Sequence, residues 1–401
     1  MGLILNDLKN VCELEHVCDY VNNRTTSSMN YISTENMLPN KGGISESTII
    51  PHGTTIEYKI GDILISNIRP YFQKIWCADR CGGCSADVLC IRAKENTDSK
   101  YLYYLLSQQA FFDYVMSGAK GCKMPRGDKK QIMQWPVNIP AIDVQKKVVA
   151  ILSSLDNKIR LNRRINDNLE EQAKALFKSW FVDFEPFKNG PFADSELGKI
   201  PQGWTIGTLS DVGDVIGGGT PSKAVSEYYT NEGIAWITPK DLSTNNCKFI
   251  SRGETDISEL GYKNSNAKLM PRGSILFSSR APIGYISIAK NEICTNQGFK
   301  SIVPQKAGTC FIYYFLRNNT SKIESMASGS TFKEASGGLM KLLKVIIPTK
   351  EILTNFEKAV QPLFDMQENN EDESIRLSVL RDTLLPKLMS GELSVEEVSF
   401  D

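Results

Sequence analysis

The chain has 401 residues, of which 41% are hydrophobic and 23% charged, and its formal net charge is zero. This length predicts two or more folded domains, and the composition excludes a disordered or low-complexity chain. No apolar run approaches the roughly 18 residues that a membrane helix needs, and the opening MGLILNDLKNVCELEHV has no signal-peptide pattern, so we expect a cytoplasmic protein.

The neutral total hides an uneven charge distribution. Residues 201–347 carry 16 basic and 11 acidic side chains, whereas residues 348–401 carry 5 and 12. The acidic end masks a basic segment, so the overall balance does not argue against a nucleic-acid partner.

Ten cysteines without a secretion signal predict reduced thiols. A single CxxC with irregular flanking spacing is a weak zinc signal, because structural zinc sites usually have two paired knuckles. We instead expect a hairpin turn at Gly82-Gly83, with the flanking cysteines acting as small apolar residues. The four cysteines of this segment, CADRCGGCSADVLC, are Cys77, Cys81, Cys84 and Cys90.

Strands and short helices alternate in two stretches of the chain. Short helices are predicted at residues 100–116 and 310–326, where aromatic residues and leucines recur at helical spacing. Strands are predicted where β-branched and aromatic runs are bounded by Gly, Pro and Asn, at residues 61–68, 88–92, 234–238, 274–278 and 285–289.

Two long helices are predicted, one after Pro140 and one after Pro348. Apolar and Asn residues of the first recur in steps of four and three, which is typical of a coiled-coil seam, although ordinary core helices show a similar period. The first seam comprises Leu155, Ile159, Asn162, Asn166, Leu169, Ala173, Leu176 and Trp180. The second, more polar seam comprises Leu363, Gln367, Asn370, Ser374, Leu377, Arg381, Leu384 and Leu388.

The sequence repeats itself. The run Gly61 to Pro70 resembles Gly273 to Pro282, and from Ile139 and Ile347 an offset of 208 residues continues without a gap. The chain is therefore predicted to be an α+β protein made of two copies of a β-rich module followed by a long helix. The expected boundaries are a first module at 1–142, a helix at 143–182, a linker at 183–202, a second module at 203–347, a helix at 348–390 and an acidic tail at 391–401.

Catalytic motifs are missing. The chain has no GxxxxGK[ST] loop, no HExxH and only two histidines, His16 and His52. The carboxylates of Asp211 and Asp214 have no nearby nucleophile or metal ligand, so a solvated surface is favoured over an acid–base pair. The glycine run 216–222 contains Pro221 where a dinucleotide-binding helix would begin, and we expect a tight loop that lets the backbone approach a partner.

One segment favours nucleic-acid binding. Residues 118–130 place five basic residues in a glycine-containing loop, which can lay cations and backbone amides along phosphates. A solvated charged face is the alternative. The counterpart at 329–333 is less basic, which indicates that the two modules read different targets.

Several segments together resemble type I restriction-modification specificity subunits. They are IPAIDVQKKVVAILSSLDNKI, LFKSWFVDFEPF, GKIPQGW, LSDVGDVIGGGTPS, SNIRPYF, SSRAPIGYI and LRDTLLPKLMSGEL, and they follow the family's order over essentially the whole chain. The resemblance implies two target-recognition domains, each reading half of a bipartite double-stranded DNA target, and two spacer helices that pack antiparallel. The polar second seam departs from uniformly apolar helix packing.

The resemblance also implies a division of labour. Two modification subunits bind S-adenosylmethionine and methylate adenine, and restriction subunits use ATP and Mg to cut DNA, so this chain is expected to be non-catalytic and to bind no cofactor or metal itself. A DNA methyltransferase or nuclease with a divergent active site, or a structural adaptor for proteins, are the alternatives. A four-residue insertion within 157–168 is expected to lengthen the unread spacer by about two base pairs, since one helical turn rises about 6 Å.

The residues expected to contact DNA are polar or basic and lie near the ends of predicted strands or in loops. For Arg69 and Arg280, holding a loop is the alternative role. The DNA-contact set is Asn67, Arg69, Lys74, Lys120, Lys123, Arg126, Lys129, Thr220, Ser222, Lys223, Ser279, Arg280 and Lys333. The helix-packing set is Leu155, Ile159, Asn162, Leu169, Leu176, Trp180, Leu363, Asn370, Leu377, Leu384 and Leu388.

Overall fold

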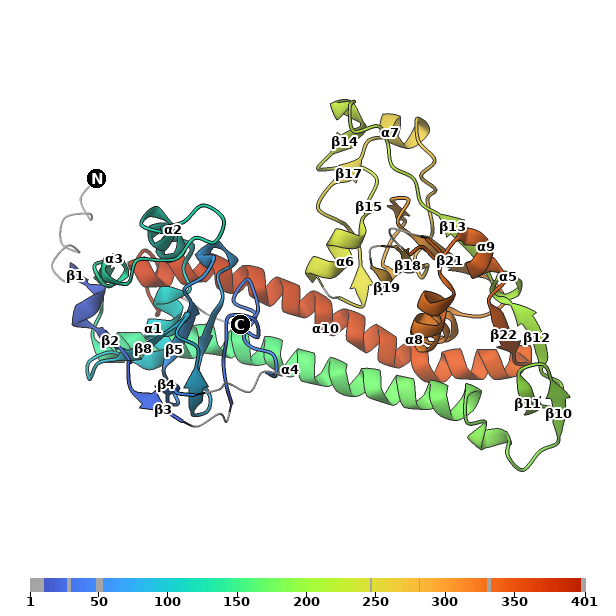
Figure 1. Ribbon diagram of the computed structural model, residues 1–401, viewed down its shortest axis with the longest axis horizontal. Coiled ribbons are helices and arrows are strands. Elements are labelled where there is room, and N and C mark those ends of the chain that lie inside the picture. Colours follow the sequence, from blue (N-terminus) through green and yellow to red (C-terminus); the bar gives the residue numbers. More distant parts are fainter. Residues whose placement is uncertain are drawn as a thin grey trace. The chain divides into compact units, whose positions relative to one another are not determined.

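The computed structural model describes residues 11–26, 30–47, 53–245, 247–280, 282–329 and 333–397. The chain divides into two compact units, the first made of residues 1–159 with 376–401 and the second of residues 160–375. Both long helices, α4 (Ile142–Phe181) and α10 (Lys350–Ser390), contribute one half to each unit (Figure 1). No helix in the described part of the chain is both long and apolar enough to cross a membrane.

The core of the first unit is an antiparallel sheet in the order β2-β8-β5-β6. Its central strands are buried on both faces because side chains alternate, so that Ile63 and Ile65 pack on the helices while Leu64 joins a second apolar cluster. The strands of this unit are β1 (Val11–Glu13), β2 (Cys18–Tyr20), β3 (Arg24–Thr25), β4 (Thr55–Tyr58), β5 (Ile63–Ser66), β6 (Ile75–Cys77), β7 (Gly82–Cys84), β8 (Val88–Ala93) and β9 (Pro136–Asn138). Its short helices are η2 (Leu14–His16), η3 (Pro70–Phe72), α1 (Ser99–Leu106), α2 (Gln109–Ser117) and α3 (Lys129–Met133).

Two predictions for this unit are wrong. The single helix predicted at 100–116 is two helices, because Gln108 adopts an extended backbone (φ −70°, ψ 148°) between them. Gly82 and Gly83 form no hairpin turn. They lie in β7, opposite Tyr58 and Glu57 of β4, so β6 and β7 belong to different sheets.

The second unit repeats this plan. Its sheet has the order β13-β21-β18-β19-β16, in which β16 is an added strand parallel to β19. The strands are β10 (Phe192–Ser195), β11 (Gly198–Pro201), β12 (Thr205–Thr208), β13 (Gly213–Gly217), β14 (Tyr229–Thr230), β15 (Trp236–Ile237), β16 (Phe249–Ile250), β17 (Asp256–Ile257), β18 (Ile275–Ser279), β19 (Ile283–Ala289), β20 (Cys294–Thr295), β21 (Lys300–Pro304) and β22 (Lys344–Ile347). The short helices are η4 (Glu185–Phe187), α5 (Leu209–Val212), η5 (Ser226–Tyr228), α6 (Pro239–Asn245), α7 (Glu259–Lys263), α8 (Thr309–Met326) and α9 (Gly337–Lys341).

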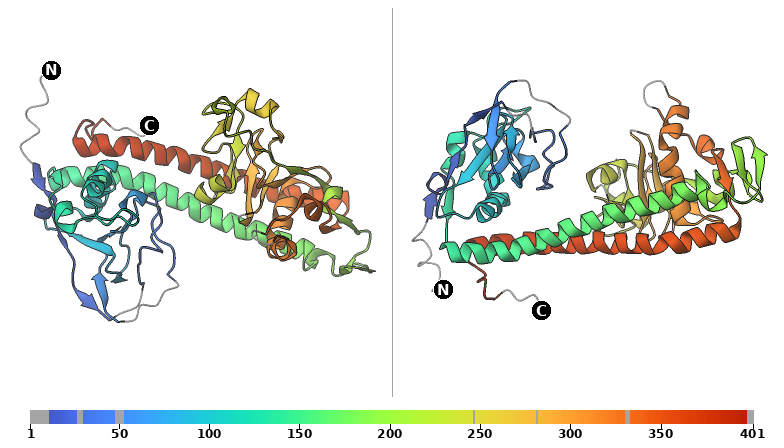
Figure 2. Two further views of the ribbon diagram at one scale, coloured as in Figure 1. Left: turned by 45° about the horizontal axis from the view of Figure 1, so that its top comes forward. Right: turned by 90° about the horizontal axis from the view of Figure 1, so that it is seen from below.

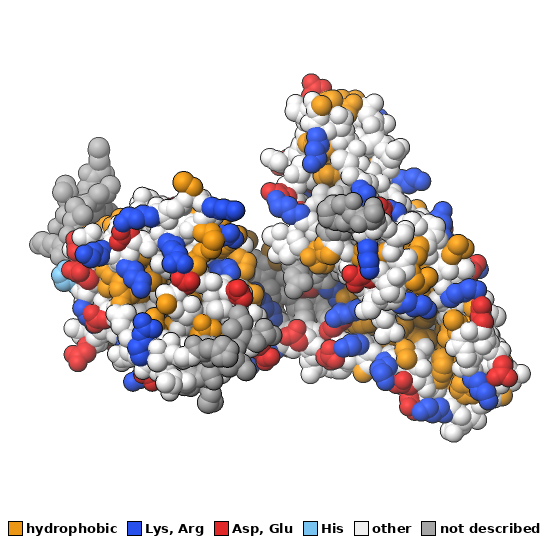
Figure 3. Space-filling model, in the orientation of Figure 1, with side chains coloured by type: hydrophobic (Ala, Val, Ile, Leu, Met, Phe, Trp, Pro, Cys, Tyr) orange, Lys and Arg blue, Asp and Glu red, His pale blue; other side chains and the backbone are white. Residues whose placement is uncertain are grey.

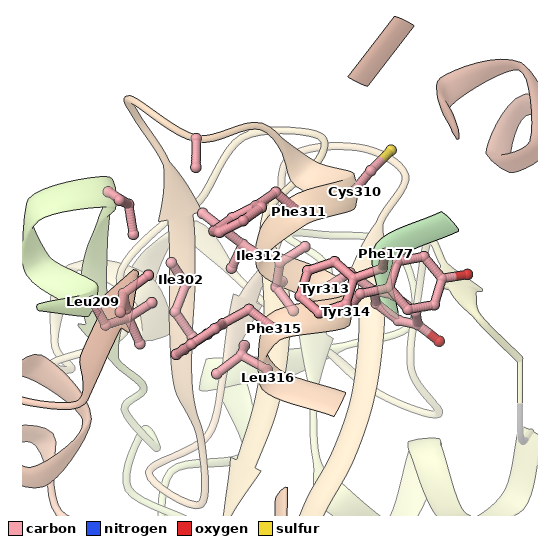
Figure 4. Close-up of a cluster of buried hydrophobic side chains, with 14 of the residues drawn as sticks. Phe177, Leu209, Ile302, Cys310, Phe311, Ile312, Tyr313, Tyr314, Phe315 and Leu316 are labelled. Atoms are coloured by element: carbon pink, nitrogen blue, oxygen red, sulfur yellow. The ribbon is translucent and has the colours of Figure 1, made fainter. Parts of the chain in front are cut away.

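Both long helices belong to the core of the second unit. Phe177 and Phe181 of α4 and Phe356 of α10 are buried in one cluster with Phe311 and Tyr314 of α8. Figure 4 shows Phe177 beside the α8 rings, while Phe311 and Phe315 extend toward Ile302 of β21. Burying each such ring contributes about 1.5–3 kcal/mol, so α8 is anchored between sheet and helices.

The helices run antiparallel within the second unit, as their pairing shows (Figure 2). Asn162 is 1% exposed and donates from Nδ2 to Glu373 Oε2 at 2.8 Å and to Ser374 Oγ at 3.3 Å. One turn further along α4, Asn370 Nδ2 donates to Asn166 Oδ1 at 2.9 Å. The expected polar seam is therefore held by hydrogen bonds between the helices, although the buried Oδ1 of Asn162 has no partner among the described residues.

The opposite halves of the helices close the core of the first unit. Leu152 of α4 and Leu385 and Leu388 of α10 join the apolar cluster beneath the sheet. Arg381 Nη1 lies 2.8 Å from Asp156 Oδ1, so the two helices also share a half-buried ion pair. Of the predicted packing residues, Leu155, Ile159, Asn162, Leu169 and Leu388 are buried, whereas Leu176, Trp180, Leu363, Asn370, Leu377 and Leu384 are half-buried.

The expected α+β class with an internal duplication is confirmed by the matching sheet orders of the two units. The first long helix ends one residue before the predicted boundary, and the second begins two residues after it. Predicted features at His52, Ala281 and residues 330–332 lie outside the described residues.

Candidate nucleic-acid interface

In the first unit, the end of β5 is tied to the basic loop, residues 118–130. Gly127 N donates to Asn67 O at 3.3 Å, and Arg69 N donates to Pro125 O at 2.8 Å. Ile68 and Arg126 form an isolated antiparallel bridge between these hydrogen bonds. The strand end and the loop are therefore one surface, although the paired residues are about sixty positions apart in sequence.

The basic loop is closed by its own backbone. Lys120 N donates to Arg126 O at 2.9 Å, and Arg126 N donates to Lys120 O at 3.0 Å. The Asp128 carboxylate then begins α3 by accepting from the backbone N–H groups of Lys130 and Gln131. Hydrogen bonds from Lys120 and from these N–H groups lower the pKa of Asp128.

The cations of the loop face solvent. Lys123, Lys129 and Lys130 are exposed, and Figure 3 shows Lys and Arg side chains interspersed with apolar ones on this unit. Lys120 pairs with Asp128 at 2.9 Å and Arg126 with Asp87 at 3.1 Å, and both pairs are largely exposed. Such surface pairs contribute only about 0–1 kcal/mol, so phosphates can replace these carboxylates at little cost.

Arg69 and Lys74 lie on either side of the short helix η3. Arg69 has a left-handed backbone (φ 50°), and its buried Nε has no hydrogen-bond partner among the described residues. Lys74 Nζ donates to Thr34 O at 2.7 Å. Burial lowers the pKa of Lys74, and the nearby Arg69 lowers it further. The alternative role, in which Arg69 holds a loop through its guanidinium, finds no support in these contacts.

The second unit has the same frame with different charges. Ala335 N donates to Ser279 O at 2.9 Å, and Arg280 forms an isolated bridge with Glu334, as Ile68 does with Arg126. Arg280 is thus equivalent to Ile68 rather than to Arg69. Its Nη1 lies 3.2 Å from Glu334 Oε2, and Lys300 Nζ lies 3.1 Å from Oε1 of the same carboxylate. Arg280 therefore takes part in holding the loop.

The prediction that the Ser279 side chain contacts DNA is corrected by its burial. Ser279 is 0% exposed, and its hydroxyl donates to Gly298 O at 3.0 Å. The side chain therefore supports the neighbouring loop. Ser222, Lys223 and Lys333 are exposed.

A cleft of about 740 Å³ in the second unit brings three predicted residues together, namely Thr220, Lys223 and Arg280. Sequence reasoning missed the other polar side chains of this cleft. Thr220 hydrogen-bonds to Gln297, and Lys240 pairs with Glu254 at 2.5 Å. The signal that could have found Gln297 is the run Asn296-Gln297-Gly298, a polar turn directly after a strand. The cleft is further lined by Tyr229, Trp236, Thr238 and Asn296.

The glycine run packs against the protein itself. A Cβ on Gly218 would lie 1.9 Å from Asn296 O, and one on Gly219 would lie 2.3 Å from Ala267 N. Trp236 Nε1 also donates to Gly219 O at 2.9 Å. The expected approach to a partner is therefore corrected, because the close neighbours of Gly218 and Gly219 belong to the chain itself.

The carboxylates of Asp211 and Asp214 have structural partners. Asp211 forms a capping box with Thr208, whose backbone N–H and hydroxyl donate to it at 2.7 and 2.9 Å. These hydrogen bonds lower the pKa of Asp211. Gln305 Nε2 donates to Asp214 at 2.9 Å. Helix capping therefore accounts for Asp211, and a surface hydrogen bond accounts for Asp214.

The cysteine segment places its thiols in different surroundings. Cys84 and Cys90 are buried in an apolar cluster, Cys77 is half-buried and Cys81 is exposed. Burial raises the pKa of the Cys77 thiol, and a hydrogen bond with Cys84 together with burial raises the pKa of the Cys90 thiol. Within the described ranges, no group of three or more His, Cys, Asp or Glu residues is placed to hold a metal ion.

The fold and the two surfaces define a protein built from two binding modules of one type. A family model for the type I restriction modification DNA specificity domain matches residues 6–171 and 201–373. The chain therefore belongs to the type I restriction-modification specificity family and carries two of its target-recognition domains, as its motifs predicted.

Individual relatives agree with this assignment. The HindI specificity subunit of Haemophilus influenzae is 28% identical over 433 residues, which cover 90% of this chain and 94% of that subunit. The MjaIX specificity subunit of Methanocaldococcus jannaschii is 37% identical over 186 residues, 46% of this chain and 43% of that one. The crystal structure of a type I restriction-modification S subunit from M. genitalium matches with a TM-score of 0.57 at 15% identity, covering 97% and 98% of the two chains, and supports the fold.

Proposed function

We propose that this chain is the non-catalytic DNA-reading subunit of a type I restriction-modification complex, with one half-site of a bipartite duplex target read by each unit. The observation that carries the proposal is the basic loop of the first unit, where backbone hydrogen bonds hold exposed cations beside the end of β5. Cations of this kind position a duplex through its phosphates, while nearby polar side chains read base edges.

The two units are suited to different half-sites. In the first, the candidate contacts are mostly Lys and Arg of one loop. In the second, the cleft offers amide and hydroxyl groups, including Asn296, Gln297 and Thr220, beside Lys223 and Lys240. Amides can pair with adenine in the major groove and Arg or Lys with guanine, so the two surfaces select different bases.

The chemistry is assigned to partner subunits. We expect two modification subunits that bind S-adenosylmethionine, and restriction subunits that use ATP and Mg, to assemble with this chain in the cytoplasm. The phosphate-loop motif that binds ATP is missing from this sequence, and so are methyltransferase motifs, which supports the division.

The test is modification mapping. The chain is expressed with its expected modification subunits in a host without other adenine methylation, and the genomic DNA is sequenced for methylated bases. We expect one motif made of two half-sites separated by a fixed unread spacer. A contiguous motif, or no modified motif from an assembled complex, would contradict the proposal.

A second measurement separates the enzyme alternatives. The purified chain is incubated alone with duplex DNA and labelled S-adenosylmethionine, and in parallel with Mg. We expect neither methyl transfer nor cleavage. Either activity in the isolated chain would establish a divergent active site. Salt-insensitive DNA binding, or none, would favour the protein-adaptor alternative.

A further inference from the structure

The connection between β5 and β6 is an exposed aromatic turn, which we define as residues 69–74. Its single helical turn, η3, presents Tyr71, which is 49% exposed, and Phe72, which is 38% exposed. Their ring centroids are 4.6 Å apart. Met124 of the basic loop is also 48% exposed. Single exposed apolar residues are ordinary, but two adjacent rings on one tight turn form a concentrated apolar feature.

The backbone of this turn is held in an unfavourable conformation. Arg69 and Gln73, at its two sides, both have left-handed φ angles of 50°. Asn40 and Lys41 also have left-handed φ angles, and they hydrogen-bond to this turn. Asn40 N donates to Phe72 O at 2.8 Å, and Lys41 N donates to Gln73 O at 3.0 Å. Such strain persists where surrounding contacts impose it, and it is concentrated at ligand-binding positions. These hydrogen bonds hold the backbone of Phe72 and Gln73 in place.

The turn lies next to cations of the same unit. Lys74 Nζ lies 5.9 Å from the centroid of Phe72, and the Nε of Arg69 is buried without a hydrogen-bond partner in the described part of the chain. The hydrogen bond from Arg69 N to Pro125 O joins the turn to the basic loop, which carries Lys123 and Arg126. Two exposed apolar rings beside cations fit a ligand in which apolar groups are flanked by negative charges. Duplex DNA has this chemistry, because its stacked bases lie between two rows of phosphates.

Building on the proposed DNA-binding function, we propose that Tyr71 and Phe72 form a wedge that inserts at one base step of the half-site read by the first unit. The rings partly unstack this step and kink the duplex, while Lys74 and the basic loop contact the flanking phosphates. The cost of unstacking is offset by the larger protein surface that the kinked duplex contacts. The wedge then selects flexible base steps without hydrogen bonds to bases.

The repeat offers an internal comparison. At the offset that aligns Gly61 with Gly273, Tyr71 corresponds to Ile283 and Phe72 to Gly284. Ile283 is half-buried at the start of β19, and Gly284 has no side chain to insert. The wedge therefore belongs to one unit, and the distortion is confined to one half-site.

The experiment uses the assembled complex and duplexes carrying the mapped target, with 2-aminopurine replacing one adenine at a time in each half-site. The adenines that the modification subunits extrude for methylation are expected to brighten in either half-site. At all other adenines, we expect fluorescence to rise several-fold on binding at one step of one half-site only. The double variant Tyr71→Ala/Phe72→Ala loses this rise and binds roughly tenfold more weakly, as expected when base–ring stacking is removed. Tyr71→Phe is expected to keep both the fluorescence rise and the affinity. Phe72→Leu is expected to keep part of the fluorescence rise, because leucine is also a wedge residue.

The matched control is Ile60→Ala. Ile60 is 69% exposed in the same unit but precedes β5, whereas the turn follows it, so this variant removes exposed apolar surface without touching the wedge. Circular dichroism and thermal unfolding identify any variant that fails to fold, in which case Tyr71→Phe and Phe72→Leu still test the proposal. Wild-type binding to the target without a fluorescence rise at any adenine other than those extruded for methylation would overturn the wedge while leaving DNA binding intact.

Two further outcomes separate the explanations. If the wild-type complex binds no DNA, the proposed function itself fails. If the double variant keeps its DNA affinity and fluorescence signal but no longer co-purifies with the modification subunits, the aromatic turn is a protein-docking surface and the wedge proposal is overturned.

Discussion

Arg126 of the first unit and Glu334 of the second occupy equivalent positions with opposite charge. Arg126 forms an isolated bridge with Ile68, two positions beyond the end of β5. Glu334 forms an isolated bridge with Arg280, one position beyond the end of β18. Each is followed by a residue whose N–H donates to the strand end, at Asn67 O and Ser279 O. One backbone frame therefore presents a cation in one unit and a carboxylate in the other.

We expect Arg126→Ala to weaken binding of the target duplex by a few-fold and to reduce the slope of log affinity against log salt by about one, because one phosphate contact is lost. Asp87 then loses its exposed partner, which costs little stability. Titrations at several salt concentrations measure the effect. An unchanged affinity at moderate salt would remove Arg126 from the interface.

The converse change is Glu334→Ala. Arg280 and Lys300 both pair with this carboxylate, so its removal frees two cations and makes the surface more basic. We expect affinity for non-specific DNA to rise and discrimination between target and non-target DNA to fall. Competition binding measures both quantities, and Glu334→Gln distinguishes charge from shape. Improved discrimination would contradict this role for Glu334.

The glycine run offers a matched stability test. Gly218→Ala places a methyl group against the carbonyl oxygens of Asn296 and Thr295, so we expect the free energy of unfolding of the second unit to fall by about 2 kcal/mol or more. At Gly217 the same Cβ meets nothing within 4 Å, so Gly217→Ala is the control and is expected to have little effect. Thermal unfolding compares them, and equal melting temperatures would refute the close packing of Gly218.

Lys248 is a buried cation of the second unit, 8% exposed and 2.8 Å from Glu170. Its ammonium lies 3.3 Å from the ring centroid of Phe364. Burial lowers the pKa of Lys248 to about 8, although Glu170 acts in the opposite direction. Desolvation alone would raise the pKa of Glu170, but Lys248 and Arg317 lower it overall.

The pH dependence follows from this shift. Between about pH 8 and the ordinary lysine value of 10.5, the unfolded chain binds a proton at Lys248 that the folded chain has released. The contribution of Lys248 to the free energy of unfolding therefore rises with pH across this window. Lys248→Met removes the rise and lowers stability at pH 7 by about 3 kcal/mol, since Glu170 loses a buried partner. Denaturant titrations from pH 7 to 10 measure the free energy of unfolding of the wild type and of Lys248→Met. A difference between the two that stays constant with pH would contradict the lowered pKa of Lys248.

The polar seam is tested at Asn162. Asn162→Ala leaves the carboxylate of Glu373 and the hydroxyl of Ser374 without this donor, and we expect a loss of about 1–3 kcal/mol in the free energy of unfolding. Asn168→Ala is the control, because Asn168 is exposed and its side-chain oxygen accepts a hydrogen bond from Gln172 on the same helix. If the two variants unfold alike, the seam does not depend on Asn162.

Local spacing made much of the fold predictable. The period of three and four residues identified both long helices, since helix formation depends on residues that are close in sequence. The strands β5, β8, β18 and β19 were predicted to within a few residues from their β-branched runs. The break at Gln108 was missed because its extended backbone interrupts a continuous helical pattern.

The candidate site was predictable only in part. The basic loop was visible because its cations are adjacent in sequence, and the duplication identified the two strand ends. The burial of Ser279, the pairing of Arg280 with Glu334 and the burial of Lys248 were not visible, because each depends on neighbours between 19 and 119 residues away.

The sequence by itself determined that the chain has two copies of one α+β unit, where its long helices lie and which of its loops is basic. These properties are recorded in local periodicity and in the repeat, which the chain carries whether or not it is folded. Only the tertiary structure decided that Arg126 and Glu334 are equivalent, that Gly218 packs on the chain itself and that Tyr71 and Phe72 are held on a strained, exposed turn. Those relationships arise from hydrogen bonds and close packing between distant segments, which form only when the chain folds.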